Sequence, residues 1–224
     1  MQVASIDGCR RAQPPIYLGV PELAESLGTV HKYEVESAVY RQHDPADHWY
    51  LIVSGAARKC AQMANGRRQI MDFLLPGDLF GFGSAARRDC SVECVGANTT
   101  VVRYQRHRME SLMEADQRLA RCIRAIIFGS IDRLQSRMML LGCSRAVERV
   151  CGFLLEMAQR AQRERDGLVE LPMSRYDIAD YLAIAVETVS RSLTTLRSEQ
   201  VITFVGTRHF RIVNLKSLEA RCCR

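Results

Sequence analysis

The polar side chains with the clearest chemical potential lie in one short stretch, AVETVSRSLTTLRSEQVI, which spans residues 185–202. If this stretch is helical, spacings of i, i+3, i+4 and i+7 place four of them on one face: Glu187, Ser190, Arg191 and Thr194. Val189, Leu193 and Leu196 form a narrow apolar stripe on the opposite side. A guanidinium can donate two parallel hydrogen bonds to guanine, and a carboxylate can accept one from the amino group of cytosine. The stretch therefore predicts a helix that reads base edges in the DNA major groove.

A second helix is expected directly before this one. Ser174 is a suitable N-cap residue, and Asp177 stands three residues later, where a carboxylate stabilises a helix start. The connection at 183–185 is short, and two short helices joined by a tight turn are typical of the helix-turn-helix motif. The alternative is that Glu187 and Arg191 only form an ion pair on a solvated helix, worth about 0.2–0.5 kcal/mol. The preceding helix and the turn favour base reading.

A two-stranded wing is predicted after these helices, because VITFV and HFRIVN flank the turn at 206–208. Arg208, His209 and Arg211 are placed to contact phosphates and so to add affinity that does not depend on sequence. A charged wing on plain solvated surface is the alternative. The residues expected to contact the DNA backbone are Ser174, Arg175, Thr188, Thr194, Arg208 and His209.

Residues from about Met109 to Gly142 have the pattern of one long helix. Its apolar residues are spaced four, three, four and three, which is the pattern of a coiled-coil seam: Ile127, Ile131, Leu134, Met138 and Leu141. Before this seam the apolar residues shift to another face of the helix, through Leu119, Ile123 and Ile126, as expected if that part packs on the preceding domain. A long helix with such a seam needs a partner, and a second copy of the chain is the simplest one. We therefore expect a homodimer; packing only within the same chain is the alternative.

The segment at 32–105 reads as short strands separated by turn signals such as Asn65-Gly66 and Pro76-Gly77. It predicts a small β-roll or barrel, preceded by a stretch at 17–29 that looks helical. The expected fold class is α+β, with an N-terminal β-roll, a long dimerisation helix and a C-terminal winged helix-turn-helix. The expected divisions are a sensor-like roll at 1–108, the helix at 109–142 and the DNA-binding domain at 143–224.

Composition fits this interpretation. The 224 residues carry a net charge of +6, almost all of it from Arg, which suits contacts with phosphates and guanine. No apolar run is long enough to cross a bilayer, and the start of the chain lacks an apolar signal core, so we expect a cytoplasmic protein without a membrane partner. Nine scattered cysteines without a C-x-x-C argue against a structural zinc site or a disulfide framework. No nucleophile–base arrangement indicates an enzyme.

The order of these parts resembles the CRP–FNR superfamily of bacterial transcription regulators over nearly the whole chain. LPGDLFGF in the roll and RYDIADYLAIAVETVSRSLTTL near the end are similar to the FNR/FixK branch. The resemblance implies that Glu187, Ser190 and Arg191 read each half of a TTGAT-type inverted repeat in double-stranded DNA. It places Val186 where cyclic-AMP receptors carry an Arg, and a valine there favours thymine over guanine. It also implies an activator that contacts RNA polymerase in a low-oxygen cascade, with the loop at 84–89 as one candidate contact.

Departures from that family limit the expected cofactors. The N-terminal region offers only Cys9, so the thiolate ligands of an iron–sulfur cluster are missing. The phosphate-binding cassette for a cyclic nucleotide is also missing, and Arg87 and Arg88 are expected in an exposed charged loop. The spacing of the histidines gives no support for haem: His31, His43, His48 and His107. We therefore expect no cofactor, and the effector is unknown.

Two kinds of alternative stay open. One is a regulator of the same family gated by a haem-bound gas or by oxidation of cysteines, with Cys90 and Cys94, or Cys222 and Cys223, as candidate thiols. The remote one is an enzyme or ligand-binding module that uses a pocket in the roll. A smaller departure is Ala185, where relatives often carry a capping Thr; the missing oxygen costs on the order of 1 kcal/mol.

Overall fold

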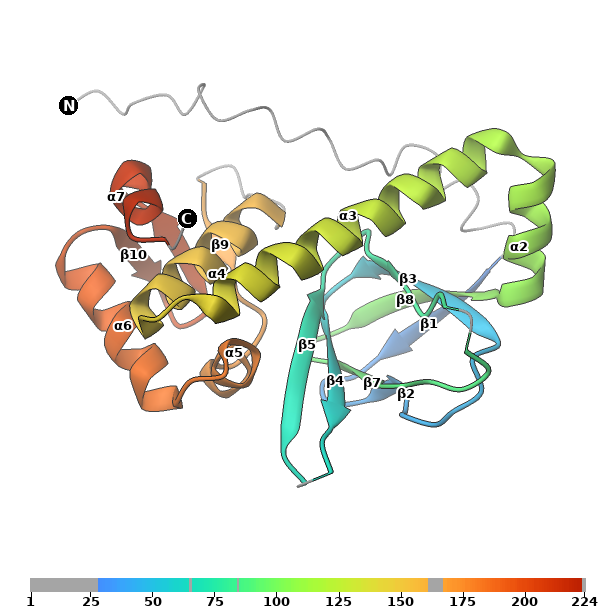
Figure 1. Cartoon of the computed structure of the whole chain (residues 1–224), viewed down its shortest axis with the longest axis horizontal. Helices are drawn as coiled ribbons and strands as arrows, with labels where there is room; N and C mark the ends of the chain where they lie inside the picture. Colours follow the sequence, from blue (N-terminus) through green and yellow to red (C-terminus); the bar gives the residue numbers. More distant parts are fainter. Residues whose placement is uncertain (1–27, 65, 84, 161–166, 223–224) are drawn as a thin grey trace.

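The computed structural model describes residues 28–64, 66–83, 85–160 and 167–222. Within these residues the N-terminal half is a roll of two four-stranded antiparallel sheets (Figure 1). The first sheet has the order β1 (Thr29–Tyr33), β8 (Thr99–Gln105), β3 (His48–Ser54) and β6 (Leu79–Phe80). The second has the order β2 (Ala38–Tyr40), β7 (Ser91–Cys94), β4 (Ala57–Gln62) and β5 (Arg68–Leu74). The predicted β-roll is confirmed, whereas the helix expected at 17–29 lies, apart from its last two residues, outside the described residues.

The inner faces of the two sheets close over an apolar core that includes Tyr40, Tyr50 and Phe80. Arg88 enters this core: it is 6% exposed, and its guanidinium lies 4.5 Å from the centre of the Tyr40 ring. It donates hydrogen bonds to the carbonyl oxygens of Gly81 and His48. The expectation of an exposed charged loop is therefore wrong for Arg88, because two aromatic faces and two carbonyls compensate the charge inside the roll.

Two helices follow the roll where the sequence predicted one. α2 (Arg106–Ala115) and α3 (Gln117–Gly142) are separated at Asp116, whose backbone is extended. The Asp116 carboxylate accepts hydrogen bonds from the backbone N–H groups of Arg118 (2.7 Å) and Leu119 (3.3 Å). A short acidic side chain favours such caps over helix interiors, and this explains why the continuous helix from Met109 was wrong.

α3 runs along the molecule from α2 to the C-terminal domain (Figure 1). Its first turns pack on the roll, because Leu119 and Ile123 join an apolar cluster with Trp49 and Tyr104. The drift of the apolar stripe toward the roll is thus confirmed. The later turns carry the seam residues on one side and contact the roll on the other, through Arg133 with Asp78 and Arg137 with β5.

The C-terminal domain begins with α4 (Ala146–Arg160) and continues with the short strand β9 (Val169–Glu170). α5 (Arg175–Leu182) and α6 (Val186–Ser198) form the predicted helix-turn-helix. β10 (Ile202–Val205) and β11 (His209–Ile212) pair antiparallel as the predicted wing, and β9 adds a third strand beside β11. A last short helix, α7 (Leu215–Ala220), was not predicted.

The roll and the C-terminal domain share one apolar core. Ile70 and Phe73 of β5 lie in the same cluster as Phe153 of α4 and Tyr181 of α5. The Phe73 and Tyr181 rings are 5.1 Å apart between centroids. Continuous packing of this kind fixes how the two domains sit on one another. In the part of the chain that the structure describes, no helix has the length and apolarity needed to cross a membrane.

Candidate nucleic-acid interface

The first helix of the motif is held by a capping box. The Ser174 hydroxyl oxygen accepts from the backbone N–H of Asp177 at 3.1 Å, and the Asp177 carboxylate accepts from the backbone N–H of Ser174 at 3.0 Å. α5 ends at Ala183, which adopts the left-handed conformation (φ +52°) that a non-glycine residue rarely takes. This turn aims the chain into α6, whose N-cap Ala185 makes no side-chain hydrogen bond, as its missing oxygen requires.

α6 is anchored by the predicted apolar stripe. Val189 and Leu196 are fully buried and Leu193 nearly so, in the core shared with α4 and α5. Glu187, Arg191 and Thr194 are exposed on the other side, with Ser190 half-buried between them. The structure therefore brings the predicted base-reading residues together on the open face of the first turns of α6. Val186 is half-buried and packs partly against the core.

The Glu187 carboxylate and the Arg191 guanidinium are available for a ligand. Within the described residues neither group forms an ion pair, although they stand one helical turn apart. The alternative of a surface pair between them is therefore not realised in this structure. Two exposed, oppositely charged groups that leave each other free are suited to guanine and cytosine edges.

The residues expected to contact the DNA backbone differ in how exposed they are and in whether they already form hydrogen bonds within the protein. Arg175 donates a hydrogen bond from its guanidinium to the Ser190 hydroxyl at 3.3 Å, and this links the start of α5 to α6. The Thr194 hydroxyl donates back to the carbonyl oxygen of Ser190 at 2.9 Å. Thr188 is half-buried, and Ser174 is engaged in the capping box. Tyr176, at the start of α5, is 69% exposed and is a further candidate for contact with the DNA backbone. Tyr176 was not predicted from the sequence, because only its position next to Arg175 indicates such a contact.

The wing presents part of its predicted set. Its turn contains Gly206 at φ +65°, and Arg208 and Arg211 are exposed on it. The backbone carbonyl of Arg208 accepts from the N–H of Leu171 at 2.6 Å, which fixes the turn to the segment after β9. His209 is half-buried, and its backbone pairs with Glu170. Of the three predicted wing contacts, Arg208 and Arg211 are therefore better placed than His209.

The seam of α3 is apolar and uncovered. Exposed large apolar side chains in this stretch are Phe128, Ile131, Leu134, Met138 and Met139, and Met138 reaches 74% exposure. Ile127 and Leu141 are half-buried, and Ile127 packs partly against the roll. Phe128 and Met139 were missed because the heptad pattern assigned the seam to their neighbours. A contiguous apolar face of this kind normally marks an interaction surface.

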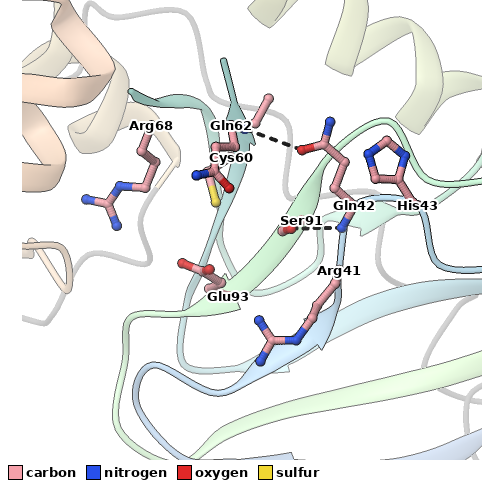
Figure 2. Close-up of a pocket in the computed structure, with 9 residues that line it drawn as sticks. Arg41, Gln42, His43, Cys60, Gln62, Arg68, Ser91 and Glu93 are labelled. Atoms are coloured by element: carbon pink, nitrogen blue, oxygen red, sulfur yellow. Dashed lines mark hydrogen bonds between the residues drawn. The ribbon is translucent and has the colours of Figure 1, made fainter. Parts of the chain in front are cut away.

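A polar groove of about 610 Å³ lies on the outer face of the second sheet (Figure 2). It is lined by Arg41, Gln42, His43, Cys60, Ala61, Gln62, Arg68, Ser91 and Glu93. The backbone N–H of Gln42 donates to the Ser91 hydroxyl at 2.9 Å, which ties the segment after β2 to the start of β7. Arg68 extends from β5 toward the C-terminal domain rather than across the groove (Figure 2). The groove is thus a border of the contact between the two domains and lies outside the roll interior.

Burial changes the acidity of four cysteines, three in the roll and one on α4. Burial raises the pKa of Cys60 and Cys94 to about 11, and that of Cys90 and Cys151 to about 12. Attack on oxidants requires the thiolate, so at neutral pH these thiols react slowly. Of the other two candidate thiols, Cys222 is half-buried and Cys223 lies outside the described residues.

Comparison with known proteins agrees with this arrangement. Residues 148–221 match the model of the Crp-like helix-turn-helix domain, and residues 30–116 match that of the cyclic nucleotide-binding domain. The nitrogen fixation regulation protein FixK of Azorhizobium caulinodans is 37% identical over 190 residues, or 84% of this chain and 76% of the relative. The FixK protein of Rhizobium meliloti is 33% identical over 86% of this chain and 87% of its own length.

A solved structure is similar over the same extent. The structure of FixK2 from Bradyrhizobium japonicum superposes with a TM-score of 0.82 at 35% sequence identity, and the match covers 88% of this chain and 98% of that one. Both the roll and the DNA-binding domain fall within the matched part. The chain therefore belongs to the FixK-type branch of the CRP–FNR family and is a DNA-binding transcription regulator, not an enzyme.

Proposed function

We propose that the protein is a homodimeric activator that binds a TTGAT-like inverted repeat with the first turns of α6. The observation that carries the proposal is the exposed pair Glu187 and Arg191, which have no ion-pair partner among the described residues. Arg191 donates to O6 and N7 of the half-site guanine, and Glu187 accepts from N4 of a cytosine on the other strand. Ser190, held beside Arg175, contacts the same half-site, and Val186 packs on a thymine methyl group.

The dimer supplies the second half-site. The exposed apolar face of α3 packs against the same face of a second copy, which buries Ile131, Leu134 and Met138. Two recognition helices related by the two-fold axis then sit about 34–36 Å apart in successive major grooves. Arg175, Tyr176 and Arg208 are exposed near these helices or on the wing, where phosphate contacts add affinity.

The relatives support a role in oxygen-linked gene control. Three of them bear the name nitrogen fixation regulation protein, and others are named as transcriptional activators. The proposed role is activation of genes of this class in the cytoplasm through contact with RNA polymerase. The loop at 84–89 remains the proposed contact; its described part pairs with the β2–β3 connection through Pro45 and Arg87.

We propose that the roll acts without a cofactor. Support comes from Arg88 and the aromatic rings around it, which occupy the interior where a small effector would need space. The raised pKa values of Cys60, Cys90 and Cys94 argue against gating by oxidation at these positions. A visible absorption spectrum of the purified protein tests the haem alternative, and we expect no Soret band.

Selection of duplexes from a random pool by the full-length protein tests the proposed function. The expected product is an inverted repeat with TTGAT-like arms, recovered equally with and without air. A half-site without two-fold symmetry would contradict the dimer. Recovery of duplexes without a common motif would contradict base reading by α6.

A further inference from the structure

Four charged side chains join the roll to the first helix of the DNA-binding motif. Arg58 of β4 and Asp177 of α5 are almost fully buried, and their guanidinium nitrogen and carboxylate oxygen are 2.9 Å apart. Arg68 of β5 contacts Asp177 at 3.1 Å and Asp180 at 2.9 Å. We call Arg58, Arg68, Asp177 and Asp180 the interdomain ion-pair cluster. Figure 2 shows Arg68 leaving the groove toward the DNA-binding domain.

The cluster binds the first turn of α5, the helix that precedes the recognition helix in the helix-turn-helix motif. Asp177 is also the third residue of α5 in its capping box, so Arg58 and Arg68 bind the turn in which the helix begins. The Gln69 side-chain amide donates to the backbone carbonyl of Asp180 at 2.7 Å. A displacement of the β4–β5 hairpin is therefore transmitted to α5, and from α5 through the shared core to α6.

α3 is tied to the same place. The Arg137 guanidinium donates to the carbonyl oxygens of Ile70 and Met71 in β5 and, at 3.1 Å, to that of Tyr181 in α5. The same guanidinium lies 4.3 Å from the centre of the Tyr181 ring. The helix that carries the dimer seam is thus connected to the recognition motif through β5 as well as through the chain itself.

A second attachment lies on α4. Arg160 contacts Asp72 at 3.3 Å and Asp78 at 2.8 Å, both in or beside β5. Along the chain only Cys143–Arg145 connect the DNA-binding domain to α3, so its orientation depends on its contacts with the roll: the shared apolar core, Arg160 on α4 and the interdomain ion-pair cluster on α5. The cluster adds a charged attachment at the start of α5 to the apolar packing between the domains. Domains joined by a short linker and a modest interface otherwise move relative to one another.

We propose that the interdomain ion-pair cluster determines the half-site spacing that the dimer accepts. The seam of α3 fixes the two-fold axis, and the cluster, acting with the shared apolar core and Arg137, fixes α6 relative to α3, so the distance between the two recognition helices is set. Adding one base pair between half-sites moves them by about 3.4 Å and rotates them by about 35°. A dimer with rigid domains cannot follow that change. This inference rests on the proposed function, because it requires a dimer on an inverted repeat.

Charge replacement at the exposed edge of the cluster tests the inference. Arg68 and Asp180 have side chains 36% and 31% exposed, so substitutions there leave the apolar cores in place. Two guanidinium groups serve four carboxylates: Glu36, Glu93, Asp177 and Asp180. Arg68→Glu adds a fifth carboxylate and repels α5, whereas Arg68→Glu combined with Asp180→Arg restores an opposite-charge pair. Glu110→Gln, which removes an exposed ion pair with Arg106 on α2, is the matched control.

The measurement is affinity for a series of duplexes whose half-site centres are one helical turn apart, or one or two base pairs closer or farther. We expect the wild type and Glu110→Gln to lose about tenfold or more per altered spacing, the size of a mismatched base pair. Arg68→Glu should bind all spacings within about threefold of one another, and the charge-swapped double variant should recover most of the discrimination.

A merely structural defect gives a different result, because partial unfolding lowers the active fraction equally on every duplex and leaves the ratios between spacings unchanged. If the ratios of affinity between spacings were the same in Arg68→Glu as in the wild type, this inference would be wrong, and the proposed function would be unaffected. Failure of the wild type to bind any duplex of the series would overturn the proposed function, and the inference with it.

Discussion

At the scale of single residues, the chemistry of recognition depends on groups that the fold leaves unsatisfied. Most charged side chains near the domain contact have partners, such as Arg58 with three carboxylates and Arg160 with three more. Glu187 and Arg191 are exposed and unpaired within the described chain. An exposed charged group without a protein partner on an anchored helix can replace its hydrogen bonds to water with hydrogen bonds to a base.

Val186 offers a test of a single specificity position. Its side chain is half-buried at the first position of α6, so its methyl groups are held in place but cannot donate a hydrogen bond. Val186→Arg should shift preference at one half-site position from thymine toward guanine, by about 1–3 kcal/mol. Binding to duplexes that differ only at that base measures the shift. Unchanged base preference would show that residue 186 does not face the groove.

At the scale of elements, α6 lacks a side-chain hydrogen bond at its N-cap, Ala185. Ala185 has the extended backbone (φ −70°, ψ 145°) that an N-cap residue adopts, yet it has no oxygen to accept from the first free N–H groups. Ala185→Thr should raise the free energy of unfolding by about 1 kcal/mol. Chemical denaturation monitored by circular dichroism measures the change. A loss of stability would mean that the added side chain clashes where the turn is tight.

Sequence patterns predicted the elements with strong local signals. The apolar stripe of α6, the Ser174–Asp177 capping box and the wing turn at Gly206 depend on short-range spacing, and all three are present. The break at Asp116 was missed because one acidic residue in a helical pattern is as common on a helix surface as at a cap.

Contacts between distant segments could not be predicted. Arg88 looked like loop surface, since nothing local indicates that Tyr40, more than forty residues earlier in the chain, would face it. The pair formed by Arg58 and Asp177 joins residues 119 positions apart. Sequence spacing along one helix or strand carries no information about such a pair, so the base-reading face was predictable and the interdomain ion-pair cluster was not.

At the scale of the whole molecule, the proposed dimer depends on the exposed face of α3. Burying Met138 contributes about 1.5–3 kcal/mol per copy, or about 3–6 kcal/mol per dimer, and a charge there adds a desolvation cost. Met138→Glu should therefore weaken dimerisation at least 100-fold and abolish tight binding to the inverted repeat. Sedimentation equilibrium measures the first effect.

The control is the same substitution, Met63→Glu, at a residue that is 53% exposed in the turn after β4, at the far end of the β4–β5 hairpin from α3 (Figure 1). It should leave the dimer intact. A Met138→Glu protein that remains dimeric would place the interface elsewhere on the surface.

In the proposed dimer, two recognition helices face one duplex, and specific binding depends on contact between Arg191 and a guanine. The direct measurement is the affinity of wild type, Arg191→Ala and Arg197→Ala for an operator and for duplexes with that guanine replaced. Arg197 is exposed in the last turn of the same helix and serves as the control. Arg191→Ala should lose about 1–3 kcal/mol on the operator and cease to distinguish the replaced bases, while Arg197→Ala keeps the distinction. An equal loss on every duplex would show that Arg191 contacts only phosphate, and base reading by α6 would then be wrong.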